Sequence, residues 1–141
     1  MGIYLDYNAS APIDPRVLSV MVDVYQNHQG NADSRTHAFG DDVRAITEKA
    51  RKQVAGLLGV ESAGIIFTSG ATESNNIAIL GLREYGERHS RKHIITSTIE
   101  HKAVLGAVRH LEEVGFDVEY INPEENGRID ANKIIAAVRS D

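Results

Sequence analysis

The chain has 141 residues, of which 42% are apolar and 25% charged, a balance typical of a globular domain with its own core. A formal net charge of −5 argues against a primary nucleic-acid binder, which needs a basic face, and the absence of Cys excludes disulfides and thiolate zinc sites. No apolar stretch approaches the ~20 residues of a membrane span, and residues 1–6 do not form a signal peptide. We therefore expect a cytoplasmic protein without a metal site and without direct nucleic-acid or membrane contacts.

The first sixty residues predict an arm followed by two helices. Asp14 and Pro15 provide an N-cap and a first helical residue, and apolar residues continue at helical spacing to Tyr25. After a polar loop, a second apolar stripe predicts a helix from about Asp41 to Leu58, which Gly59 is placed to end. We assign residues 1–14 to the arm and 15–60 to the two helices.

From residue 61 onward, short apolar segments alternate with amphipathic ones. The pattern predicts strands at 65–68, 94–97 and 117–121. It also predicts a helix that ends near Gly86, a second that ends near Gly115 and a last helix that begins at Asp130. Ser97 and Glu100 have the spacing of a capping box. This order predicts an α/β fold of parallel βαβ units, with helices covering both faces of the sheet.

The predicted sheet is thin for a complete domain. Three parallel strands leave apolar edges exposed, and the last predicted helix is amphipathic and needs a sheet to pack on. We therefore expect a fragment, or one piece of a larger assembly, in which residues 61–141 form the first part of a truncated domain.

One loop carries residues suited to anion binding. Gly70 permits a tight turn and close approach of a ligand, Ala71 is small, and Thr72 and Ser74 offer hydroxyl groups. The free N–H groups and the dipole of the following helix favour an anion at this position. From these residues alone, a phosphate site without a lysine and a plain polar loop with capping residues are equally good interpretations.

Four motifs in order resemble the NifS/IscS-type cysteine desulfurases, which are fold-type I pyridoxal-phosphate (PLP) enzymes of aminotransferase class V. The resemblance covers essentially the whole chain but only about the first third of that family's length. The matching segments are Tyr4–Pro12, Gly30–His37 with Phe39-Gly40, Thr68–Asn76, and Ile94–Ser97 followed by Glu100–Leu105.

The resemblance implies roles for four residues. Gly70, Ala71 and Thr72 match the segment that holds the PLP phosphate, and His101 matches the histidine that stacks on the cofactor ring and helps to move protons. A flat imidazole that titrates near neutrality suits both tasks. Without the resemblance, His101 would be interpreted as a partly exposed residue in the first turn of a helix.

The resemblance also implies contacts at the mouth of the active site. Asn8, Ala9 and Ser10 match a segment that folds over the mouth, although a plain turn is an equal alternative. Asn31 and His37 match a loop near the active site or dimer interface, where a structural hydrogen-bonding role is the alternative. Three positions depart from the family, which usually has Thr where this chain has Ser10 and Ala11 and Pro where it has Ala32. Ser10 keeps a hydroxyl group and Ala11 loses one.

In the resembled family the Schiff-base lysine and the catalytic cysteine come after residue 141. The full-length enzyme would convert L-cysteine to L-alanine and pass sulfur, as an enzyme persulfide, to an acceptor or scaffold protein. Iron–sulfur cluster assembly, tRNA thiolation and DNA sulfur modification would all use this segment. We expect a homodimer at full length and an inactive chain alone.

Two other interpretations stay open. The chain could be a non-catalytic truncated homologue or complementation fragment that acts as an interaction module. It could also belong to another fold-type I PLP enzyme, such as a selenocysteine lyase or an aminotransferase for small amino acids. A generic nucleotide-binding domain is disfavoured, because the glycine-rich dinucleotide and P-loop motifs are both missing.

Overall fold

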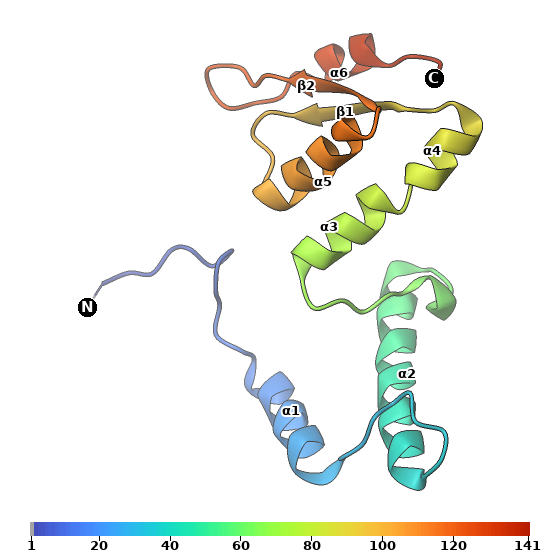
Figure 1. The fold of residues 1–141 in the computed structure, drawn as a ribbon. Helices are drawn as coiled ribbons and strands as arrows, with labels where there is room; N and C mark the ends of the chain where they lie inside the picture. The colour runs from blue at the N-terminus through green and yellow to red at the C-terminus, as the bar shows by residue number, and fades with distance from the viewer. Residues whose placement is uncertain (1) are drawn as a thin grey trace. The chain divides into compact units, whose positions relative to one another are not determined.

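The computed structural model describes residues 2–141 and divides into two compact units (Figure 1). The first unit ends at Ile66 and the second spans Phe67–Asp141. The domain boundaries expected from the sequence stay a prediction.

The first unit holds the two predicted helices. Helix α1 spans Pro15–Asn27, with Asp14 as its N-cap, and helix α2 spans Ala38–Leu58. Gly59 ends α2 in the left-handed conformation, with φ 68°, as the sequence predicted. A short 3₁₀ helix, η1, follows at Ser62–Gly64.

Helix α2 begins three residues before the predicted start because His37 caps it. The ring Nδ1 of His37 accepts a hydrogen bond from the backbone N–H of Gly40 at 3.1 Å. The preceding loop lies against this first turn, so that a Cβ on Gly40 would be only 2.4 Å from the carbonyl oxygen of Ser34. Arg44 donates from α2 to the carbonyls of Ala32 and Ser34, at 3.2 and 3.0 Å. The close backbone packing at Gly40 and the two hydrogen bonds from Arg44 therefore fix the loop that precedes α2.

The second unit is a βαβ arrangement with helices on both faces of its sheet. Strands β1 and β2 pair in parallel, from His93 opposite Asp117 to Ser97 opposite Ile121. In Figure 1, α5 and α6 lie on opposite sides of these strands. The bounds are α3 Ala71–Leu80, α4 Arg83–His89, β1 His93–Ser97, α5 Lys102–Glu113, β2 Asp117–Ile121 and α6 Ala131–Ala137. The parallel α/β fold expected from the sequence is confirmed.

The strand predicted at 65–68 is wrong. Residues 65–68 have no strand assignment, and Ile66 and Phe67 are 66% and 49% exposed. A strand needs a neighbouring backbone to complete its hydrogen bonds, and the sheet formed by the described residues contains only β1 and β2. The expected sheet of three strands is therefore a sheet of two in residues 2–141.

The helix predicted to run to Gly86 is also wrong, because it breaks at Gly81. The N–H of Leu82 bonds to the carbonyl of Ile79 rather than one residue further back, which tightens the turn before α4 begins. Glycine favours this break because it loses more backbone entropy in a helix than any other residue. A Cβ at Gly81 would also lie 2.4 Å from the carbonyl oxygen of Ile77.

The core of the second unit forms along one face of α5. Leu111 is 2% exposed, and the neighbouring strands and α6 contribute further buried side chains. By contrast, α1 contains no buried residue. The buried apolar residues of this core are Ala103, Ala107, Val108, Leu111, Phe116, Ile121 and Ala137. The second unit therefore has the better-defined core.

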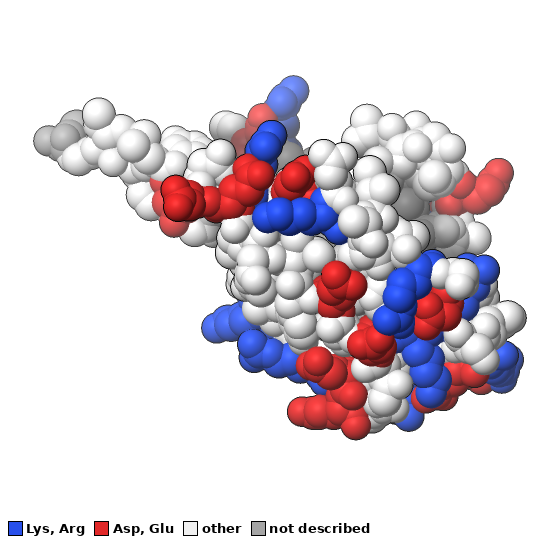
Figure 2. All heavy atoms as spheres, turned by 90° about the horizontal axis from the view of Figure 1, so that it is seen from above, with Lys and Arg blue, Asp and Glu red and all other residues white. Residues whose placement is uncertain are grey.

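Charged side chains of both signs are interspersed on the helices and on the loop between β2 and α6. Ion pairs at i,i+4 spacing join Arg83 to Glu87 at 2.9 Å, and Arg128 bonds to Glu124 at 3.1 Å. The face shown in Figure 2 likewise carries basic and acidic side chains next to one another. Within residues 2–141, no helix is both long enough and apolar enough to cross a membrane.

His28 links the end of α1 to the start of α2, and we predict that this link depends on pH. Its ring Nδ1 lies 2.6 Å from a carboxylate oxygen of Asp42, and its Nε2 lies 3.8 Å from Asp23. The hydrogen bond to Asp42, with smaller contributions from the charges of Asp42 and Asp23, raises the pKa of His28 above 6.5. The stability that the protonated His28 ring contributes is therefore fully present below pH 6.5 and is lost as pH rises through the raised pKa.

NMR titration of the His28 ring measures this effect. We expect a midpoint above the ordinary histidine value in the parent protein and a return toward that value in Asp42→Asn, which removes the charge at nearly constant shape. An ordinary midpoint in the parent protein would show that the contact with Asp42 does not form in solution.

Candidate functional site

The candidate site begins at the turn that leads into α3. Gly70 is the N-cap of this helix, with φ 159° and ψ −179°, a combination that is essentially restricted to glycine. A Cβ added to Gly70 would meet no atom within 4 Å, so the space beside the turn is open. A ligand can therefore approach the backbone here without displacing a side chain.

The carbonyl group of Gly70 is held by the Ser74 N–H and by a pair of hydroxyl groups. It accepts from the Ser74 N–H at 3.1 Å, and the hydroxyl oxygens of Thr68 and Ser74 lie 3.2 and 3.3 Å from it. The two hydroxyl oxygens also lie 2.7 Å from each other, so one hydroxyl donates to the carbonyl and the other donates to the first. Because C=O and N–H point in opposite directions across a trans peptide, this fixes the Ala71 N–H pointing away from these donors.

The first N–H groups of α3 have no partner of their own. No side chain caps the helix, and the N–H groups of Ala71 and Thr72 have no acceptor among residues 2–141. Helix α3 has ten residues, and its dipole adds a partial positive charge at this end. Exposed donors, an open space and a positive helix end fit the ester phosphate of PLP.

Glu73 lies in the first turn of α3 but bonds backward along the chain. Its Oε2 accepts from the backbone N–H of Ser69 at 2.6 Å and from the Ser69 hydroxyl at 2.7 Å. The backbone bond, and then the hydroxyl bond, hold the pKa of Glu73 below 4.5. The sequence analysis gave Glu73 no role, although an acidic residue in a first helical turn was a usable signal.

His101 is the N-cap of α5 and lies a few residues beyond the end of β1. Its Nδ1 accepts a hydrogen bond from the Ala103 N–H at 3.1 Å, so the neutral ring carries its proton on Nε2. The capping box expected of Ser97 and Glu100 is wrong. The Ser97 hydroxyl does donate to Glu100 at 2.9 Å, but the helix begins at Lys102 with His101 as its cap.

The first turns of α3 and α5 lie at one end of the second unit. The two helices pack against each other, and both start toward the same side in Figure 1, the side to which the two strand arrows point. In parallel α/β folds, ligands bind outside the carboxyl ends of the strands. The end of the unit that carries the turn at Gly70 is therefore also the end that carries His101.

The arm residues proposed for the mouth of the site belong to the first unit. Asn8, Ala9 and Ser10 are exposed, and the N–H groups of Ala9 and Ser10 donate to the Asp6 carbonyl at 3.1 and 3.3 Å. These bonds form the plain turn that the sequence analysis gave as the alternative. A contact between the arm and the active site stays a prediction.

The loop residues proposed for the site form local hydrogen bonds in the first unit. The Asn31 side chain accepts from the Asp33 N–H at 3.0 Å, and His37 caps α2 at the Gly40 N–H. The second ring nitrogen of His37 lies 3.1 Å from the Ser34 hydroxyl. Both residues therefore support the loop, and their role at the active site stays a prediction.

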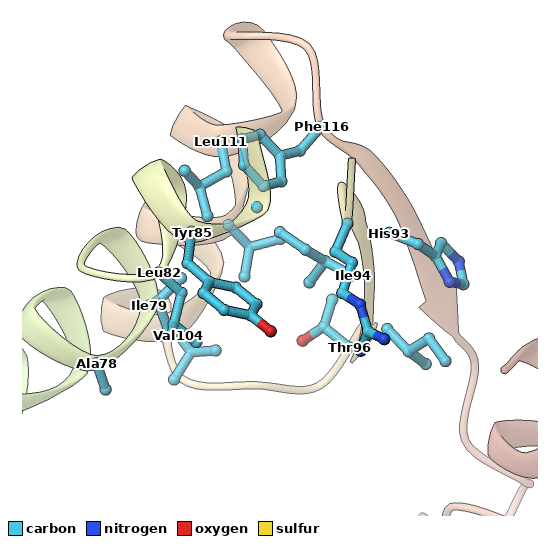
Figure 3. Close-up of a pocket in the computed structure, with 14 residues that line it drawn as sticks. Ala78, Ile79, Leu82, Tyr85, His93, Ile94, Thr96, Val104, Leu111 and Phe116 are labelled. Carbon is cyan, nitrogen blue, oxygen red and sulfur yellow. The ribbon is translucent and has the colours of Figure 1, made fainter. Parts of the chain in front are cut away.

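A separate apolar pocket of about 510 Å³ lies between α3, α4, α5 and β1 (Figure 3). None of the residues proposed to hold the cofactor lines it. Its lining is mostly aliphatic and aromatic and includes Ile79, Leu82, Tyr85, Ile94, Leu111 and Phe116. We interpret this pocket as an incompletely covered part of the core, distinct from the turn at Gly70.

Comparisons with known proteins bear on the family and the fold of the chain. The model of the aminotransferase class-V family matches residues 3–141. Cysteine desulfurase IscS of Methylobacillus flagellatus is 48% identical over 139 residues, which are 99% of this chain and 34% of that protein. The chain therefore spans about a third of the length of this relative.

Two solved structures are similar in fold. One, described as a NifS-like protein, has a TM-score of 0.88 at 39% identity and covers 100% of this chain and 38% of its own. Another, described as SspA in complex with cysteine, has a TM-score of 0.84 at 38% identity, and the match covers 97% of this chain and 39% of that structure's chain. On the family match and these similarities, the chain belongs to the aminotransferase class-V family.

Proposed function

We propose that this chain is the N-terminal part of a PLP-dependent cysteine desulfurase. That enzyme converts L-cysteine to L-alanine and passes the sulfur to an acceptor or scaffold protein. The name of the Methylobacillus relative and the cysteine complex of the SspA structure support the reaction. The observation that carries the proposal is the pair of unpartnered N–H groups at Ala71 and Thr72, beside an open space at Gly70.

The residues of the turn would bind the cofactor through its phosphate. The N–H groups of Ala71 and Thr72 donate to the phosphate oxygens, and the positive end of α3 offsets part of the phosphate charge. When bound, PLP supplies an electron sink for negative charge that develops on the amino-acid substrate. This chain contributes to that chemistry by holding and orienting the cofactor.

His101 would form one wall of the cofactor site. The bond from the Ala103 N–H holds its ring at Nδ1, so the ring cannot turn freely and its Nε2 is left for other partners. A held, planar imidazole can stack on the cofactor ring and donate its Nε2–H beside it, and the ring takes up a proton at Nδ1 when the cap bond from the Ala103 N–H opens. We therefore propose His101 as the proton-transfer residue of this segment.

The two covalent steps need groups from outside these residues. The sequence has no Cys, so the thiol that receives the sulfur must come from elsewhere. We propose that this cysteine and the Schiff-base lysine lie outside residues 1–141, and that the chain alone is inactive. A homodimer in the cytoplasm, with a role in iron–sulfur cluster assembly or another sulfur-transfer pathway, completes the proposal.

The direct test is turnover by the full-length protein. Loaded with PLP and given L-cysteine and a thiol reductant, it should release alanine and sulfide in equal amounts, because each cleavage of the carbon–sulfur bond yields one of each. L-selenocysteine serves as the comparison substrate. Release of selenide without release of sulfide would assign the protein to the selenocysteine lyases instead, and PLP binding without either product would contradict a desulfurase.

The phosphate site is tested by placing a charge in it. Thr72→Asp should keep α3 folded, because an acidic residue stabilises the first turn of a helix. It should nevertheless weaken PLP binding by about tenfold or more, since the new carboxylate repels the phosphate. Thr72→Asn is the matched neutral control. Equilibrium dialysis measures the affinity, and equal affinity in the two variants would show that the phosphate binds elsewhere.

The role of His101 is tested by a variant that keeps the helix cap. His101→Asn should leave thermal unfolding nearly unchanged, because Asn is a favourable N-cap residue. It should lower sulfide release from L-cysteine by about 100-fold or more, because the proton-transfer group is lost. His110→Asn, at an exposed position on the same helix, is the control. Full activity in His101→Asn would leave only the capping role.

A further inference from the structure

Glu73 makes its contacts behind the turn at Gly70 rather than with the N–H groups of the turn itself. An acidic residue in a first helical turn usually interacts with the exposed N–H groups of that turn. Glu73 instead directs Oε2 to the N–H and the hydroxyl of Ser69, at 2.6 and 2.7 Å. Ser69 lies one residue before the N-cap, so the carboxylate is held behind the turn and the N–H groups of Ala71 and Thr72 have no protein acceptor.

The two sides of Gly70 are therefore fixed by different residues. On one side, the hydroxyls of Thr68 and Ser74 hold the Gly70 carbonyl. On the other side, Glu73 holds both donors of Ser69. Gly70 itself has the greatest backbone freedom of any residue, so without these contacts the turn would sample many conformations before an anion binds.

From these contacts we infer that Glu73 is a positioning residue for the phosphate-binding turn. It fixes the peptide group between Thr68 and Ser69, together with the Ser69 side chain, and keeps its own carboxylate away from the anion position. Both effects lower the cost of binding, because less backbone freedom is lost and no internal anion has to be displaced. This inference rests on the proposed PLP site and assigns to that site a residue that does not itself contact the cofactor.

The charge of Glu73 and its hydrogen bonds have opposite effects on phosphate. The bonds to Ser69 order the turn, whereas the negative charge repels a phosphate a few ångströms away. Glu73→Gln separates the two effects, because the amide oxygen can accept the same bonds without the charge. Glu73→Ala removes both. Glu84→Ala is the matched control, since Glu84 occupies the first turn of α4, outside the candidate site.

The experiment measures PLP affinity of the full-length protein by equilibrium dialysis, together with the phosphorus-31 NMR signal of the bound phosphate. We expect Glu73→Ala to weaken PLP binding about tenfold or more, the effect of losing two hydrogen bonds of ordinary strength, and to move the signal toward that of free PLP. Glu73→Gln should stay within about threefold of the parent protein, or bind more tightly, and Glu84→Ala should match the parent.

Several outcomes would overturn the inference. It fails if Glu73→Ala binds PLP like the parent protein, or if Glu73→Gln loses as much affinity as Glu73→Ala. Thermal unfolding of the apo forms identifies a variant that does not fold. In that case Ser69→Ala, which removes only the hydroxyl bond to Glu73, replaces it. This variant should still weaken PLP binding several-fold. Unchanged PLP binding in Ser69→Ala would overturn the inference. If the parent protein itself does not bind PLP, the proposed function fails, and this is distinguishable from failure at Glu73 alone.

Discussion

The candidate site depends on the orientation of a single peptide group, the one between Gly70 and Ala71. Its carbonyl is held by the Ser74 N–H and by the hydroxyls of Thr68 and Ser74, at 3.1 to 3.3 Å. A planar trans peptide then leaves no choice for the direction of the Ala71 N–H. The ability of this turn to bind an anion thus comes from side chains that need not touch the anion themselves.

A phosphate site of this kind needs no lysine. Backbone N–H groups and the helix dipole provide fixed partial charges, and their geometry is set before a ligand arrives. A lysine side chain would add a full charge but would also lose conformational freedom on binding. The small residues Gly70 and Ala71 fit this arrangement, because they let the phosphate approach the backbone closely.

The sequence predicted those features that depend on local chemistry. Asp14 caps α1, Gly59 ends α2, and β1 and β2 lie where the apolar segments predicted strands. The predicted strand at 65–68 failed for a different reason. Its apolar pattern is real, but a strand forms only beside another backbone, and composition cannot show whether a neighbour is present.

The helix break at Gly81 and the role of Glu73 were also missed. Glycine lowers helix stability by only about 1 kcal/mol relative to alanine, which does not decide between a continuous helix and a break. The partner of Glu73 could not be chosen from sequence, because the first-turn N–H groups and Ser69 are both within reach of its side chain. Only the backbone path at Gly70 determines which of these donors the carboxylate meets.

Two histidines that the family resemblance placed at the active site share one structural role. His37 and His101 both accept a backbone N–H at Nδ1 and act as N-caps, for α2 and α5. A histidine in this position has one ring nitrogen committed to the fold and the other left for a partner. For His37 that nitrogen already lies 3.1 Å from the Ser34 hydroxyl, which makes a supporting role in the loop its main contribution.

His101 differs because its remaining nitrogen has no hydrogen-bond partner among residues 2–141. The cap fixes the ring relative to the start of α5, and the packing of α5 against α3 carries that start toward the end of the unit where Gly70 lies. A helix cap thus gives the ring a defined position and a defined tautomer, with Nε2–H left to donate to a partner, whereas uptake of a proton at Nδ1 requires the cap bond to open. The same hydrogen bond that begins a helix therefore sets which nitrogen of this histidine is available for a chemical role.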